Sequence, residues 1–180
     1  MDLAQAFGTR LVVGLGAYPA TVPHTRPVAL SVTAATEDLA AASGLLRGTL
    51  DVPAGVQAVI ERRCDEVGIP ALGLWAQIPH YVSGEPSPYH AGSLALLHQL
   101  ERTAGLSLPT GTLEAEAATT RQRLDEAVAA NPEHQAMLTA LEERHDEMVQ
   151  AGGATDGPLP SADELAAEVE QFLRDQGPDA

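Results

Sequence analysis

Lysine is absent from this 180-residue chain, and its ten basic residues are all arginine. The absence excludes a P-loop lysine, a lysine that forms a Schiff base and a lysine general base. Acidic residues outnumber basic ones by 25 to 10, which gives a net charge of −15. Because binding to a polyanion requires clustered cations, we expect no nucleic-acid partner.

Cysteine and long apolar runs are also scarce. The single cysteine, Cys64, cannot form an internal disulfide, which is typical of a reducing compartment. No run approaches the ~20 apolar residues that cross a bilayer. Residues 1–10 carry Asp2 ahead of any base and lack the apolar segment of a signal peptide. We therefore expect a cytoplasmic protein with no membrane association.

The acidity is uneven along the chain. Residues 1–110 hold nine acids and six arginines (net −3), whereas the remainder holds 16 acids and four arginines (net −12). The first part is predicted to be an α/β body. We expect an acidic helical hairpin at 111–150, a Gly/Pro linker at 151–160 and an amphipathic helix at 161–180.

Short apolar runs alternate with helical patterns in the body. Residues 11–17, 28–33 and 71–76 are each predicted to be a buried strand. Strands that alternate with helices indicate the α/β class. Three strands are few for such a sheet, which indicates that the sheet is incomplete.

Two helices are predicted between and after these strands. The first spans 55–67, stops at Gly68 and should bury its apolar side chains, Val56, Val59, Ile60, Cys64 and Val67. The second opens with Ser87 as N-cap and Pro88 at the first helical position, and it ends at Gly105. In the hairpin, Asn131-Pro132 should end one helix and cap the next.

The candidate site residues follow the ends of two strands: Pro23, His24, Thr25 and Arg26 in one loop, and Pro79, His80 and Tyr81 in the other. Open α/β sheets bind ligands at the carboxyl ends of their strands. The two histidines are expected to converge there, with Arg26 as the nearby cation and Tyr81 as a hydroxyl donor. Such a set suits a small anion or histidine acid–base chemistry. The alternative interpretation is structural: the prolines stiffen long loops and the histidines bond to backbone.

Other motifs favour no cofactor and no metal. The run from Gly14 to Pro19 has proline where a dinucleotide fingerprint has its third glycine, so its glycines are expected to permit close packing instead. Cys64 lies among acids on an apolar helix face, which predicts an inert core thiol. The histidines at 90, 98, 134 and 145 lack metal-ligand spacing and are expected to lie on solvated faces.

Three stretches resemble the proteasome assembly chaperone 2 family in its actinobacterial form. They are LVVGLGAYPATVPHTRPV (11–28), ALGLWAQIPHYV (71–82) and the tail LPSADELAAEVEQFLRDQ (159–176). The resemblance implies a three-layer α/β/α fold like that of nucleoside phosphorylases, a homo-oligomer and a role in binding proteins, with proteasome subunits among the partners. Family members are longer, so the chain is expected to match their C-terminal part only. It also has Pro53-Ala54-Gly55-Val56 where the family has a different glycine-rich turn.

Three functions remain open from the sequence. The first is a non-enzymatic assembly-chaperone-like protein. The second is a small-molecule-binding protein or enzyme that uses a crevice at the strand ends; some family members carry a carboxylate–amine ligase label, although a lysine-free body lacks the cations for ATP. The third is a remnant of a longer gene without independent function.

Overall fold

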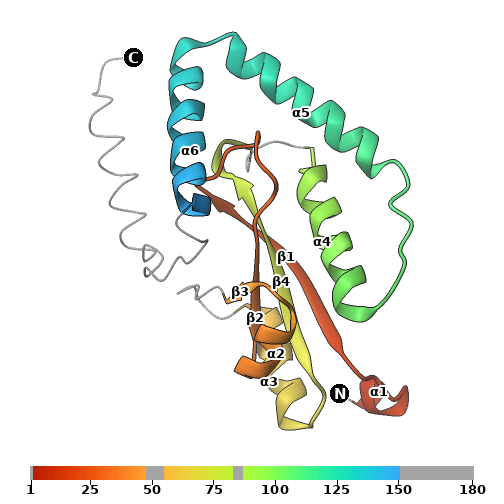
Figure 1. Cartoon of the computed structure of the whole chain (residues 1–180). Helices are drawn as coiled ribbons and strands as arrows, with labels where there is room; N and C mark the ends of the chain where they lie inside the picture. The colour runs from red at the N-terminus through yellow and green to blue at the C-terminus, as the bar shows by residue number, and fades with distance from the viewer. Residues whose placement is uncertain (1, 48–54, 83–86, 151–180) are drawn as a thin grey trace, which may run out of the picture.

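A computed structural model describes residues 2–47, 55–82 and 87–150 of the chain (Figure 1). The predicted linker at 151–160 and helix at 161–180 lie outside these ranges. The elements run in the order α1 (Asp2–Ala6), β1 (Val12–Ala20), β2 (Leu30–Ala34), α2 (Glu37–Ala42), β3 (Leu46–Arg47), α3 (Val56–Glu66), β4 (Ala71–Pro79), the 3-10 helix η1 (His80–Val82), α4 (His90–Ala104), α5 (Leu113–Ala129) and α6 (Pro132–Gln150).

The strands form one mixed sheet in the order β1-β4-β2-β3. β1 runs parallel to β4, and β2 runs parallel to β3 and antiparallel to β4. The three predicted strands are confirmed, and each extends beyond or falls short of its predicted bounds by a few residues. The two-residue β3 was not predicted, because two residues carry no readable periodicity.

Helices cover both faces of the sheet, which confirms the three-layer α/β/α class. On one face the fully buried Val32, Leu72, Leu74 and Ala76 pack against Leu96 of α4, and Ala40 of α2 belongs to the same core. The alternate β4 residues, Ala71 and Gly73, point to the other face, where α3 packs. The sheet centre is therefore the main apolar core of the described chain.

The predicted inner face of α3 is wrong for Val56, Val59 and Ile60, whereas Cys64 is buried as predicted. Val56, Val59 and Ile60 are 77 %, 60 % and 40 % exposed, whereas Glu61 and Cys64 are buried. The reason is that the sheet beneath α3 presents polar groups: Thr33 donates to the Glu61 carboxylate at 3.0 Å and accepts a bond from the Trp75 indole at 3.0 Å. A partly buried hydroxyl and indole favour hydrogen-bond partners, so the helix turns the Glu61 carboxylate, and not its valines, toward them.

The glycines of β1 permit close packing, as predicted. A Cβ at Gly16 would meet the Trp75 ring, and a Cβ at Gly14 would meet the side chain of Gln57. Two side chains thus lie directly on the strand backbone where other residues would push them away. The Gly14–Pro19 run owes its glycines to this packing.

The start of α4 differs from the prediction. The helix begins at His90 with Tyr89 as its N-cap, instead of at Pro88 after Ser87. The Tyr89 carbonyl accepts the first helical bonds, from the amides of Gly92 at 3.0 Å and Ser93 at 3.4 Å. Tyr89 is half-buried, and its side chain makes no capping hydrogen bond. The predicted end is confirmed, since Gly105 takes a left-handed φ of 65°.

α5 and α6 form the hairpin of the predicted fold and diverge above the end of the sheet like an inverted V (Figure 1). The Asn131 side chain accepts a bond from the Glu133 amide at 2.9 Å, which confirms the cap at this turn. In the two helices only Thr120 and Leu141 are buried, so the apolar stripes are only half covered. No helix of the described residues is long and apolar enough to cross a membrane.

Candidate functional site

His24 and Tyr81 come together because β1 and β4 are parallel neighbours. Ala20 at the end of β1 pairs with Pro79 at the end of β4. The loop that holds His24 and the η1 turn that holds Tyr81 therefore leave the same end of the sheet. Pro23 and His24 are buried there, and so is Pro79.

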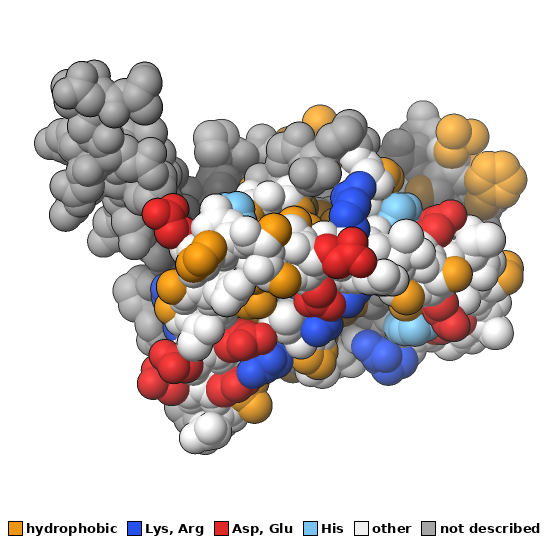
Figure 2. Space-filling view, turned by 90° about the horizontal axis from the view of Figure 1, so that it is seen from above, with side chains coloured by type: hydrophobic (Ala, Val, Ile, Leu, Met, Phe, Trp, Pro, Cys, Tyr) orange, Lys and Arg blue, Asp and Glu red, His pale blue; other side chains and the backbone are white. Residues whose placement is uncertain are grey.

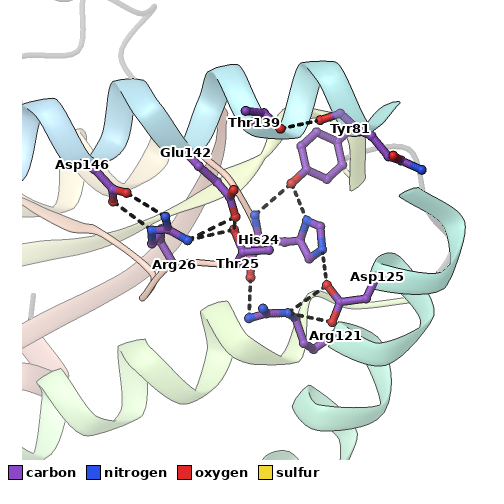
Figure 3. Close-up of polar contacts among 10 residues, drawn as sticks. His24, Thr25, Arg26, Tyr81, Arg121, Asp125, Thr139, Glu142 and Asp146 are labelled. Carbon is purple, nitrogen blue, oxygen red and sulfur yellow. Dashed lines mark hydrogen bonds and ion pairs between the residues drawn. The ribbon is translucent and has the colours of Figure 1, made fainter. Parts of the chain in front are cut away.

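His24 uses every polar atom of its ring and its backbone amide (Figure 3). The amide donates to the Tyr81 hydroxyl at 2.8 Å, and Nδ1 lies 2.7 Å from the same oxygen. Nε2 lies 3.1 Å from Oδ1 of Asp125 on α5. A carboxylate only accepts, so Nε2 carries the proton and donates to Asp125. Nδ1 then accepts from the Tyr81 hydroxyl, and the imidazole is neutral.

Burial shifts the pKa values of both His24 and Tyr81. Desolvation lowers the pKa of His24, although the hydrogen bond to Asp125 opposes the shift. Burial also raises the pKa of Tyr81 to about 12. Both groups therefore stay neutral at neutral pH, which matches the hydrogen-bond pattern.

Arg121 of α5 holds the second partner of His24 in place. Its Nε lies 3.2 and 3.1 Å from the two carboxylate oxygens of Asp125, and its Nη1 donates to the His24 carbonyl at 3.3 Å. Asp125 is thus shared between a guanidinium and an imidazole. The loop after β1 and the helix α5 are joined through both backbone and side chain.

The next two residues of the loop join it to α6. Arg26 donates from Nε and Nη2 to the two oxygens of Asp146, at 2.8 and 2.7 Å, and from Nη1 to Glu142 at 3.1 Å. Thr25 donates its hydroxyl to the same Glu142 carboxylate. The Arg26 guanidinium holds the pKa of Asp146 below its usual range. We call the residues His24, Thr25, Arg26, Tyr81, Arg121, Asp125, Glu142 and Asp146 the hairpin junction.

His80 takes a different position from His24. Both imidazole rings lie edge-on to Tyr81, with centroids 5.8 Å away for His24 and 5.3 Å away for His80. His80, however, is exposed, whereas His24 is buried. The two histidines thus meet at Tyr81, but only His24 lies inside the junction, and Arg26 binds carboxylates of α6 instead.

Four members of the junction were not predicted from the sequence, and all four lie in the hairpin: Arg121, Asp125, Glu142 and Asp146. Arg121–Asp125 and Glu142–Asp146 each have the i,i+4 spacing that puts two side chains on one helix face. That spacing is the available signal, but it is common on solvated helices. The partners lie about a hundred residues away in the sequence, as for His24 and Asp125, which are 101 apart.

A shallow cavity of about 270 Å³ lies beside the junction, between its loop, α4 and α5. Its walls include Val28, Leu94 and Ala95, with Arg26, His98 and Arg121 among the polar residues. The two guanidinium groups already bind Asp146, Glu142 and Asp125, so the cavity offers little uncompensated positive charge. Among the described residues, no group of three or more His, Cys, Asp or Glu could hold a metal ion.

The α/β fold of this chain is similar to that of several solved structures. The chain matches the model of the PAC2 family over residues 1–128, and it belongs to that family. It is 36 % identical to a PAC2 family protein from Streptomyces avermitilis, with a TM-score of 0.64, and the match covers 69 % of this chain and 52 % of that one. No curated protein matches the chain.

Two structures from Mycobacterium tuberculosis are also similar. The proteasome-assembly chaperone homologue Rv2125 is 32 % identical, with a TM-score of 0.67 over 78 % of this chain and 57 % of that one. Rv2714, a protein of unknown function, is 31 % identical, with a TM-score of 0.76 over 84 % and 51 %. The chain therefore spans little more than half the length of these structures.

Proposed function

We propose that this PAC2-family chain is a cytoplasmic, non-enzymatic protein that binds other proteins and acts in their assembly, with proteasome subunits as the partners to test. Two findings support the proposal: the family, and the likeness to a proteasome-assembly chaperone homologue from Mycobacterium tuberculosis. Self-association is a separate proposal, because a chaperone can bind its client as a monomer or as an oligomer.

The observation that carries the proposal is the internal use of the candidate catalytic groups. A general base needs one ring nitrogen within hydrogen-bond reach of its substrate. Both ring nitrogens of His24 are engaged, one with Tyr81 and one with Asp125. The cations Arg26 and Arg121 are engaged in the same way. The site residues are therefore suited to hold the hairpin in position, not to act on a small molecule.

The hairpin offers the surface for a partner. Residues 111–150 hold nine acids and three arginines. Seen from above the hairpin, carboxylates lie beside hydrophobic side chains (Figure 2). A net negative charge beside apolar side chains favours steered association with a basic protein surface. We infer that the outer face of α5 and α6, away from the hairpin junction, contacts the client.

The test is a binding and assembly measurement with purified proteasome α- and β-subunits from an actinobacterium. We expect the chain to bind α-subunits before the core forms and to change the rate at which assembled core appears on native gels. A chain that binds neither subunit and leaves the rate unchanged would refute the proteasome role. Crosslinking of the tagged chain in its host then identifies any other client by mass spectrometry.

Matched variants locate the surface. Glu133→Gln, Glu143→Gln and Glu147→Gln together neutralise three exposed carboxylates of the hairpin that lie outside the junction. The control neutralises three exposed carboxylates of the body, with Glu37→Gln, Asp38→Asn and Asp65→Asn. We expect only the hairpin variant to lose affinity, by about tenfold or more. Equal affinity of both variants would place the contact elsewhere.

A further inference from the structure

Small side chains line the cavity beside the hairpin junction. The cavity of about 270 Å³ lies between α4, α5 and the loop after β1. α4 contributes Ala91, Leu94, Ala95 and His98, whose spacing of three and four residues puts them on one side of the helix. Ala117 faces the cavity from α5. The alanines thus leave space between two packed helices that larger side chains would fill.

Three polar groups on this otherwise apolar wall keep spare hydrogen-bonding capacity. The Tyr89 hydroxyl and the His98 ring make no hydrogen bond or ion pair within the part of the chain that the structure describes. Arg121 uses Nε for Asp125 and Nη1 for the His24 carbonyl, and its Nη2 has no hydrogen-bond partner among the described residues (Figure 3). An apolar wall with a few polar groups is typical of a small-molecule site.

Tyr89 and Arg121 together suit an oxygen atom of a ligand. Burial raises the pKa of Tyr89, and the nearby charge of Arg121 opposes that shift. The phenol therefore stays protonated at neutral pH and can donate a hydrogen bond. The Arg121 guanidinium only donates. Both groups thus favour an acceptor, such as a carbonyl or hydroxyl oxygen.

The charges around the cavity disfavour an ionic ligand. Arg26 and Arg121 line it, but both guanidinium groups are already paired with carboxylates: Glu142, Asp146 and Asp125. An anion would have to compete with these carboxylates, and a cation would face two guanidinium groups. An uncharged ligand meets neither cost. The volume lies just below the ~300–1,000 Å³ of sites for drug-sized molecules, so the cavity suits a smaller one.

We propose that this cavity binds a small uncharged molecule with an apolar body and one oxygen that accepts a hydrogen bond. The apolar body contacts Leu94, Ala95 and Ala117, and the oxygen accepts from the Tyr89 hydroxyl beside Arg121. α4 and the loop belong to the body of the protein, whereas α5 belongs to the hairpin. The bound molecule therefore joins the two parts, and by mass action it stabilises the docked hairpin.

The test uses three probes of similar size in NMR titrations of the full chain. Acetophenone is an uncharged ring with a carbonyl, toluene lacks the oxygen, and benzoate carries a charge. We expect millimolar acetophenone to shift the methyl signals of Ala95 and Ala117 and to slow amide exchange in α5. Toluene should bind about three- to tenfold more weakly, which is the worth of one hydrogen bond. Benzoate should leave both methyl signals unchanged.

Matched variants locate the probe. Ala117→Leu fills the cavity, whereas Ala118 is exposed and lies outside its lining, so Ala118→Leu is the control. We expect only Ala117→Leu to abolish acetophenone binding. Tyr89→Phe keeps the ring and removes the hydroxyl, so it tests the site without filling it. It should weaken acetophenone binding about three- to tenfold and leave toluene binding unchanged.

Three results would overturn the proposal. The first is that millimolar acetophenone shifts neither methyl signal. The second is that acetophenone binding survives Ala117→Leu or is unaffected by Tyr89→Phe, which would place the probe elsewhere. The third is that benzoate binds as tightly as acetophenone, which would contradict an uncharged ligand. None of these measurements uses a client protein, so their outcome is independent of proteasome binding.

Discussion

The sheet and the hairpin of this protein are held by different forces. In the sheet, Val32, Leu74 and Ala76 are completely buried in a core that also contains residues of α2 and α4. The hairpin has only two buried residues in its helices, and the hairpin junction attaches it to the loop after β1 through charged and polar groups. Apolar burial does not depend on pH, whereas ion pairs respond to pH and are screened by salt. The comparison teaches that the hairpin can change its attachment while the sheet keeps its fold.

The largest effect should come from the sheet. Leu74→Ala removes a completely buried side chain and leaves a cavity at the centre of the core. We expect the free energy of unfolding to fall by about 2–5 kcal/mol. Urea unfolding followed by circular dichroism measures it, and Leu106→Ala, at an exposed position, should stay within about 0.5 kcal/mol of the wild type. Similar losses in both variants would contradict the assignment of the core.

A substitution in the hairpin junction should lower the free energy of unfolding by less than Leu74→Ala does. His24→Ala leaves the Tyr81 hydroxyl and the Asp125 carboxylate without their imidazole partner. We expect the free energy of unfolding to fall by about 1–3 kcal/mol. The exposed His134 of α6 is the control, and His134→Ala should change stability by no more than about 0.5 kcal/mol. If the two alanine variants melt alike, His24 is not the centre of the junction.

The hairpin junction should lose stability when the pH falls. The pKa of His24 is lowered in the folded chain, so the unfolded chain takes up the proton first. Stability is therefore complete above about pH 6.5 and falls as the pH drops from there to the folded pKa. Unfolding at pH 7.5 and 5.5 should show a larger loss for the wild type than for His24→Gln. Asp146 adds a loss only in stronger acid, because its pKa is lowered below that of a free carboxyl.

Equal losses for the wild type and His24→Gln would mean that another group controls the acid response. The groups that face His24 are Tyr81, Arg121, Asp125 and Glu142. His24→Gln keeps all four of these groups and removes only the imidazole. The comparison of the two chains therefore isolates the imidazole.

Arg26→Gln should have the smallest effect on the global free energy of unfolding. Its side chain and that of Asp146 are 30 % and 45 % exposed, so the ion pair is partly screened by solvent. Arg26→Gln should leave the sheet amides protected from hydrogen exchange while those of α6 exchange faster. Arg63→Gln, which breaks an exposed ion pair with Glu66 on α3, is the control and should not affect α6. Unchanged exchange in α6 would show that other contacts hold it.

The sequence predicted the elements better than their mutual orientation. The apolar runs of β1, β2 and β4 and the glycine that ends α4 are local signals, and the structure confirms them. The side that α3 buries depends on the Thr33 hydroxyl beneath it, which periodicity does not reveal. Likewise, the Pro-His loops predicted a polar site, but its partners Asp125 and Asp146 come from helices distant in the chain.

The hairpin junction also bears on the order in which the chain folds. The contacts between the loop after β1 and the hairpin join residues 97 to 120 positions apart, so each closes a long loop of chain. Closing such a loop costs conformational entropy before any contact rewards it. The backbone hydrogen bonds of α5 and α6 and the capped turn between them join residues close in the sequence. We expect the hairpin to dock late in folding and to detach early in unfolding, while the sheet is still intact.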